Sequence, residues 1–157
     1  MYTEPTSRNF GRVLALDLGK KRIGLAISDP LGITAQGLDT LQRTRVREDI
    51  EALASLASAR GVNEFLFGEP LHMSGDVSRQ STYTHEFAER LNRFTAIPVR
   101  FWDERLTSVE ANRVLRESGI SIEKRARAVD RLAAVILLES YLDFCRLQSS
   151  PEEDSEV

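Results

Sequence analysis

Three carboxylic acids stand at positions of the sequence where a carboxylate is unexpected. Asp17 lies inside an apolar run between two leucines, Glu104 directly follows a short apolar segment, and Asp130 begins the apolar face of a helical pattern. Burying a carboxylate costs free energy, and converging carboxylates repel one another. Divalent cations remove both costs, and oxygen ligands without Cys or His favour Mg²⁺ or Mn²⁺. The three acids therefore predict a pair of ions about 4 Å apart, an arrangement that promotes attack of water on a phosphodiester.

Each acid taken alone also has a structural interpretation. Asp17 could be a turn residue at the end of a strand. Glu104 could form an ion pair with Arg105 or Arg100, and Asp130 could be a first-turn acid that favours the helix dipole. No single acid is specific, so the prediction of catalytic and metal-binding roles rests on the combination of Asp17, Glu104 and Asp130.

Basic residues stand beside two of these acids. Lys20, Lys21 and Arg22 follow Asp17 on a short connection, and Arg105 follows Glu104. Their position predicts electrostatic contacts to the phosphates of a nucleic acid, independent of base sequence. The alternative is an ordinary solvated turn at residues 20–22 and an Arg105 that only neutralises its neighbour.

The distribution of charge permits a polyanionic partner although the net charge is −3. The last six residues hold four acids and no base, so residues 1–151 carry a charge of +1. Of the 21 basic residues, 18 are Arg, the side chain whose planar fork suits phosphate. The acidic overall composition therefore does not exclude nucleic acid.

The elements that must position these residues follow from the apolar pattern. Residues 12–18 and 23–28 read as strands joined by a tight connection, and residues 33–41 complete an antiparallel meander. The rest alternates helices and strands, predicted as helix 45–60, strand 64–67, helix 78–95, strand 98–102, helix 107–117 and helix 129–146. This order predicts an α/β fold with a mixed five-stranded sheet, its later strands parallel, and helices on both faces. Ligands of such sheets sit at the carboxyl ends of the strands.

Length and composition predict one domain within the 157 residues. We expect a flexible N-terminus at 1–9, a single domain at 10–147 and an acidic flexible tail at 148–157. The single cysteine, Cys145, excludes a disulfide framework and suits a reducing compartment. No apolar run reaches the length of a membrane span or forms a signal peptide, so we expect a cytoplasmic protein.

Four segments of the sequence carry a family resemblance: LALDLGKKRIGLAIS at 14–28, FGEPL at 67–71 with MSG at 73–75, DERLTS at 103–108, and DRLAA at 130–134 with LLESYL at 137–142. On these motifs the sequence resembles the YqgF/RuvX family. Its members are Holliday-junction-resolvase-like proteins of the RNase H superfamily to which processing of precursor 16S rRNA is ascribed. The first and third segments are the specific ones.

The resemblance implies an RNase H-like fold and a metal-dependent nuclease with Asp17, Glu104 and Asp130 as catalytic ligands of Mg²⁺ or Mn²⁺. It implies 5′-end processing of precursor 16S rRNA during ribosome biogenesis, with Holliday-junction-type DNA cleavage as a further activity. The expected partners are precursor rRNA or branched DNA and a ribosomal assembly intermediate, without a membrane. The chain is expected to be a monomer or a homodimer.

One position departs from the family pattern. Family members usually read Gly-Leu-Pro where this chain has Gly68, Glu69 and Pro70. Glu69 is either a fourth metal ligand or a solvent-exposed substitution, and we expect the second because nothing else in the chain requires the first.

Two other functions fit the sequence. One is an RNA-binding ribosome-assembly factor without catalysis, which needs the basic turn but not the metals. The other is a phosphotransferase of the actin or sugar-kinase type, which closes two such domains around ATP, whereas this chain supplies one.

Overall fold

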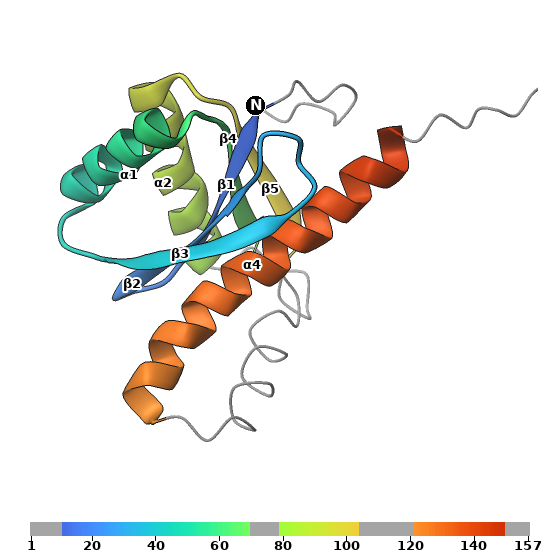
Figure 1. Cartoon of the computed structure of the whole chain (residues 1–157). Helices are drawn as coiled ribbons and strands as arrows, with labels where there is room; N and C mark the ends of the chain where they lie inside the picture. Colours follow the sequence, from blue (N-terminus) through green and yellow to red (C-terminus); the bar gives the residue numbers. More distant parts are fainter. Residues whose placement is uncertain (1–10, 70–78, 104–120, 150–157) are drawn as a thin grey trace, which may run out of the picture.

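A mixed five-stranded sheet forms the centre of the molecule (Figure 1). The computed structural model describes residues 11–69, 79–103 and 121–149. The elements in chain order are β1 (Arg12–Leu18), β2 (Arg22–Ser28), β3 (Ala35–Gln42), α1 (Val46–Arg60), β4 (Val62–Glu69), α2 (Arg79–Thr95), β5 (Val99–Asp103) and α4 (Ile122–Ser149). The helix predicted at 107–117 lies outside the described residues. So do residues 1–10 and 150–157, and the predicted domain boundaries stay a prediction.

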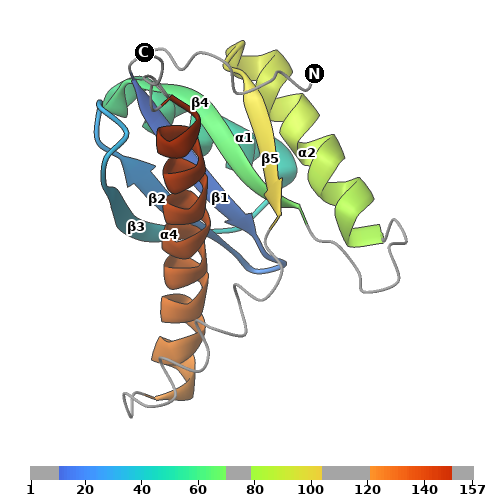
Figure 2. The same cartoon turned by 90° about the vertical axis from the view of Figure 1, so that its right-hand side faces the viewer.

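The sheet has the strand order β3-β2-β1-β4-β5. The first three strands pair antiparallel, whereas β1 pairs with β4, and β4 with β5, in parallel. Helices α1 and α2 cover one face and the long α4 crosses the other, as the two views at right angles show (Figures 1 and 2). The predicted mixed sheet with helices on both faces is confirmed.

Alternation along the strands divides the apolar core between these two faces. Leu14, Leu16 and Leu18 of β1 belong to the cluster that packs beneath α1 and α2. Val13 and Ala15 belong to the cluster that packs against α4. Since successive side chains of a strand point to opposite faces, Asp17 continues the series that faces α4. The strand thus delivers a carboxylate to the α4 side of the sheet.

The bounds of the last helix differ from the prediction. It begins at Ile122 and ends at Ser149 rather than covering 129–146. Its first turn is capped by Ser121, whose Oγ accepts a hydrogen bond from the backbone N–H of Lys124 at 3.3 Å. The predicted helix was too short because charged residues crowd the first turns of α4 and interrupt the apolar run there. Asp130 therefore lies well inside the helix, and its interpretation as a first-turn acid is wrong.

Helices α1 and α2 lie close to where the apolar pattern placed them. Helix α1 ends at Gly61, whose left-handed φ of 68° lets its N–H bond the carbonyl oxygen of Ala57. None of the helices in the described ranges combines the length and apolar character that a membrane span requires.

Candidate metal and nucleic-acid site

Gly24 brings the two described acids of the predicted site together. Asp17 on β1 stands opposite Gly24 on β2 in the antiparallel register. A Cβ atom on Gly24 would lie 2.0 Å from the carbonyl oxygen of Asp130, so only glycine lets the backbone of α4 approach this closely. The helix therefore rests on the sheet next to Asp17. A glycine inside an apolar strand is the sequence signal of such an approach, and the sequence analysis did not use it.

The two carboxylates influence each other electrically. Burial, and secondly the negative charge of Asp130, raise the pKa of Asp17 to about 7. Burial also raises the pKa of Asp130, and the hydrogen bond and charge of Arg22 partly offset that effect. Burial thus disfavours the ionised form of both carboxylates, and a nearby divalent charge would favour it.

Arg22 forms an ion pair with one of the two acids. Its Nε donates a hydrogen bond to Oδ2 of Asp130 at 3.0 Å, and both side chains are 22% exposed. This contact between β2 and α4 is one that no local sequence pattern could reveal. The predicted contact of Arg22 with a phosphate of the substrate stays a prediction.

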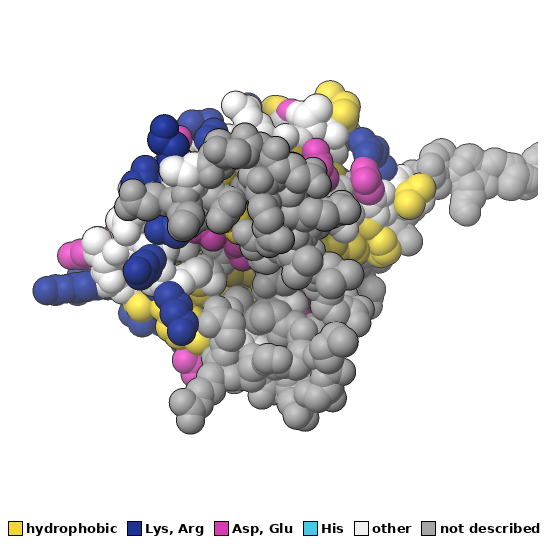
Figure 3. Space-filling view, turned by 90° about the horizontal axis from the view of Figure 1, so that it is seen from below, with side chains coloured by type: hydrophobic (Ala, Val, Ile, Leu, Met, Phe, Trp, Pro, Cys, Tyr) yellow, Lys and Arg dark blue, Asp and Glu magenta, His cyan; other side chains and the backbone are white. Residues whose placement is uncertain are grey.

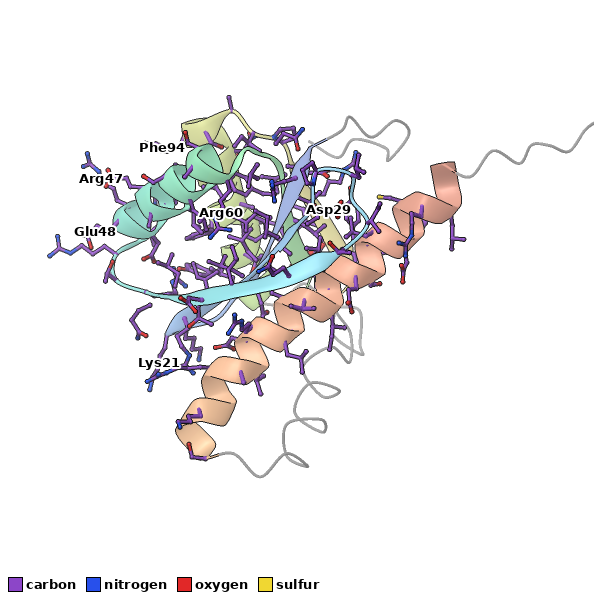
Figure 4. The ribbon with its side chains drawn as sticks, viewed as in Figure 1. Lys21, Asp29, Arg47, Glu48, Arg60 and Phe94 are labelled. Atoms are coloured by element: carbon purple, nitrogen blue, oxygen red, sulfur yellow. The ribbon has the colours of Figure 1, made fainter. Side chains whose placement is uncertain are left out.

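Lys20 and Lys21 form the exposed part of the turn between β1 and β2. Figure 4 shows Lys21 pointing away from the sheet at this end of the molecule. The view from below shows Lys and Arg side chains gathered along one side of this end, with acidic side chains beside them (Figure 3). The turn therefore presents positive charge to solvent three to four residues after Asp17.

Glu104 and Arg105 lie outside the described residues. They follow β5 directly in the chain, and the last residue of that strand, Asp103, pairs in register with Glu69 of β4. Strands β1, β4 and β5 run parallel, so their carboxyl ends share one edge of the sheet. The role of Glu104 in binding metal and the role of Arg105 in binding phosphate stay predictions.

Glu69 is only partly exposed and lies on the other face of the sheet from the acid pair. Its Oε1 lies 2.7 Å from Nε2 of His85 on α2, and its side chain is 20% exposed. The His85 ring stacks on Phe101 with centroids 3.9 Å apart. Glu69 thus lies on the α2 side of the sheet, whereas Asp17 and Asp130 lie on the α4 side. The expectation of a solvent-exposed substitution is met only in part, because the carboxylate is partly exposed and has a histidine of α2 as its partner.

The donor set suits a hard divalent cation. Asp17 and Asp130 offer only carboxylate oxygens, the ligands preferred by Mg²⁺ and Mn²⁺. Within the described ranges, no group of three or more His, Cys, Asp or Glu side chains assembles into a metal site. The two converging acids fit two positions of a ligand set whose predicted third member is Glu104.

A protein-family model described as "RuvX: Holliday junction resolvase" matches residues 11–144. The chain belongs to the RuvX family. A relative from Koribacter versatilis is 56% identical over 133 residues, covering 85% of this chain and 87% of its own. One from Clostridioides difficile is 44% identical over 134 residues, covering 85% and 95%. Both carry the name "Putative pre-16S rRNA nuclease".

The fold of this RuvX-family chain is similar to that of a protein solved with a Holliday junction substrate. Thermus thermophilus RuvC, solved in complex with a Holliday junction substrate, aligns with a TM-score of 0.55 at 12% identity, over 88% of this chain and 97% of RuvC. The likeness confirms the RNase H-like fold. Both the predicted family and the predicted fold class are therefore confirmed.

Proposed function

We propose that this RuvX-family protein is a metal-dependent nuclease that hydrolyses phosphodiester bonds in structured nucleic acid. Its proposed substrate is precursor 16S rRNA, processed at the 5′ end during ribosome biogenesis, with four-way DNA junctions as a second substrate. One observation carries the proposal: Asp17 and Asp130 converge beside Gly24 and both have raised pKa values. The names of the relatives support the choice of precursor 16S rRNA as the substrate.

The acids of the site have distinct tasks in this proposal. Asp17, Glu104 and Asp130 would hold Mg²⁺ or Mn²⁺, and the bound ions would supply an activated water and stabilise the charge of the leaving 3′ oxygen. Strand β1 supplies Asp17 from the sheet, and helix α4 supplies Asp130 from the layer that packs on the sheet. A pKa of about 7 leaves Asp17 partly protonated at neutral pH, and a nearby divalent charge favours its ionised form.

The basic residues bind and orient the nucleic acid. Lys20 and Lys21 are exposed and attract phosphates by charge. Arg22 offsets part of the negative charge of the Asp130 carboxylate through its hydrogen bond. Arg105 is proposed to contact a phosphate next to Glu104.

Cleavage assays test this proposal. Precursor 16S rRNA and a four-way DNA junction are incubated with the protein and Mg²⁺, Mn²⁺ or EDTA. We expect cleavage that requires metal and that falls by about 100-fold or more in Asp17→Asn, since a ligand is lost. The matched control is Asp39→Asn, which changes an exposed acid on β3 and should leave the rate within about twofold.

Two results would redirect the account. Cleavage by Asp17→Asn at the parent rate would refute the metal mechanism. Salt-sensitive RNA binding that persists in EDTA, with no cleavage under any condition, would support an RNA-binding assembly factor instead. The exposed Lys20 and Lys21 could serve that function without any metal.

A further inference from the structure

Arg43 is a nearly buried arginine whose guanidinium contacts three different elements. The residue follows β3, and its side chain is 9% exposed. Its Nε donates to Oδ2 of Asp49 at 3.1 Å, its Nη1 to the carbonyl oxygen of Gly19 at 2.9 Å, and its Nη2 to the hydroxyl of Tyr83. The Cζ atom also lies 5.4 Å from the ring centres of Tyr83 and Phe87. Each nitrogen of the fork therefore has a fixed partner.

Asp49 completes this cluster from the first turn of α1. Its side chain is 1% exposed and also accepts a hydrogen bond from the backbone N–H of Thr44 at 3.0 Å. Taking two charges out of water is costly, and apolar side chains of similar volume often stabilise a fold at least as well. Stability alone therefore does not explain the ion pair. What Arg43 adds beyond packing is a directed bond to the turn between β1 and β2.

The turn at residues 19–22 is held at two points by Arg43. Besides the side-chain bond to Gly19, the backbone N–H of Arg43 donates to the carbonyl oxygen of Lys21 at 2.9 Å. The turn is closed by a third bond, from the Gly19 N–H to the carbonyl oxygen of Arg22 at 3.0 Å. This turn contains the two exposed lysines, Lys20 and Lys21. It also contains Arg22, whose side chain is hydrogen-bonded to Asp130.

We propose that Arg43 is a positioning residue for nucleic-acid binding. Through Gly19 and Lys21 it fixes the turn so that Lys20 and Lys21 face a phosphate backbone in one orientation. Its own guanidinium is buried among α1 and α2 and acts only through the turn. The inference rests on the proposed binding of nucleic acid, and it adds a residue that the sequence pattern did not single out.

A variant that keeps stability while removing the bond to Gly19 tests the proposal. Arg43→Met combined with Asp49→Leu replaces the buried pair with apolar side chains, so the unfolding midpoint is expected near that of the parent. Two properties are then measured: amide hydrogen exchange at Gly19, and affinity for precursor 16S rRNA in EDTA. We expect exchange about tenfold faster and RNA affinity about three- to tenfold weaker, because the lysines must be ordered on binding.

The control is Tyr83→Phe, which removes one partner of Arg43 but leaves the bond to Gly19 in place. It should keep both the Gly19 exchange rate and the RNA affinity within about twofold of the parent. Arg43→Lys is a second variant, since one ammonium group cannot reproduce the fork, and it should resemble the double variant.

The outcomes separate the inference from the proposed function. A folded double variant with parental Gly19 exchange and parental RNA affinity overturns the positioning role. Faster Gly19 exchange with unchanged RNA affinity also overturns it, because the turn would then be ordered without benefit to binding. If the parent itself binds no RNA, the proposed function fails with it, whereas the exchange result still shows whether Arg43 orders the turn.

Discussion

Arg22 on β2 is hydrogen-bonded to Asp130 on α4, with 3.0 Å between Nε and Oδ2. The contact joins the basic turn to the acid pair. The guanidinium of Arg22 therefore already places one positive charge beside the proposed metal site. Asp17 does not share this compensation equally, since burial and the charge of Asp130 raise its pKa to about 7. The site thus has one carboxylate whose charge is partly compensated by an arginine, Asp130, and one without such a partner charge in the shift of its pKa, Asp17.

Removing the charge of Arg22 should strengthen metal binding at high pH. In Arg22→Gln at pH 8, we expect Mn²⁺ to bind about three- to tenfold more tightly than in the parent, because a guanidinium no longer repels the ion. Isothermal titration measures the affinity. Lys21→Gln is the control for charge on the same turn, and its exposed side chain should change the affinity less. Weaker Mn²⁺ binding in Arg22→Gln would instead mean that the arginine chiefly holds Asp130 in place.

The raised pKa of Asp17 makes stability depend on pH in a definite direction. The folded protein holds this proton up to about pH 7, whereas the unfolded chain releases it near the ordinary value of 3.8, so stability falls as pH rises between these values. Asp17→Asn lacks this cost. In EDTA, we compare the free energy of unfolding of the variant with that of the parent at each pH. The difference in favour of the variant should grow by up to about 4 kcal/mol between pH 4 and pH 8.

Urea unfolding at pH 4, 6 and 8 measures this difference. The exposed Asp39 again supplies a control, since Asp39→Asn should differ from the parent by less than about 0.5 kcal/mol at each pH. If the difference in free energy of unfolding between Asp17→Asn and the parent stays constant with pH, then Asp17 does not keep its proton in the folded protein up to about pH 7.

Gly24 should tolerate no side chain. In Gly24→Ala the new Cβ meets the backbone of Asp130, so α4 must move away from β2, at a cost of about 1–3 kcal/mol. The shift also separates Asp130 from Asp17, and Mn²⁺ affinity should fall about tenfold or more. Gly37→Ala on β3 is the matched control, because its Cβ would first meet the movable side chain of Arg131, 2.9 Å away. If Gly24→Ala and Gly37→Ala lose the same stability and the same Mn²⁺ affinity, then Gly24 has no special role in the site.

The exposed lysines should account for part of the salt dependence of RNA binding. Each of Lys20→Gln and Lys21→Gln should weaken RNA binding and reduce the slope of log K against log salt by about one. Filter binding from low to high salt measures the slope. Arg60→Gln, at the far end of α1 from Arg47 (Figure 4), removes the same charge and should leave the slope unchanged. If Arg60→Gln reduces the slope as much as the two lysine variants do, then the effect reflects the net charge of the protein and not the turn.

The sequence was sufficient to predict the strands, their pairing and the family, because apolar alternation and turns are local signals. Asp17 was found in the same way, as a charge in an apolar run. The partner of Arg22 was not, since it lies 108 positions away in the chain. Arg43 and Asp49 were missed because a charged residue in a polar segment has the same sequence pattern on the surface and in a buried pair. Glu69 and His85 meet only through the packing of α2 on the sheet.

The start of α4 was missed for a related reason. Its first turns contain Lys124 and Arg127, both exposed, so the dense apolar pattern on which the helix was predicted begins only near Val129. The capping residue Ser121 was the available signal, and it was overlooked because no apolar run followed it.

Crystals of the protein grown or soaked with Mn²⁺ test the central claim most directly, through the anomalous scattering of the metal. The account predicts a manganese peak bounded by the carboxylates of Asp17 and Asp130, with Glu104 as a further ligand. A crystal saturated with Mn²⁺ that shows no peak at these two carboxylates, or shows one only beside Glu69 and His85, would contradict it.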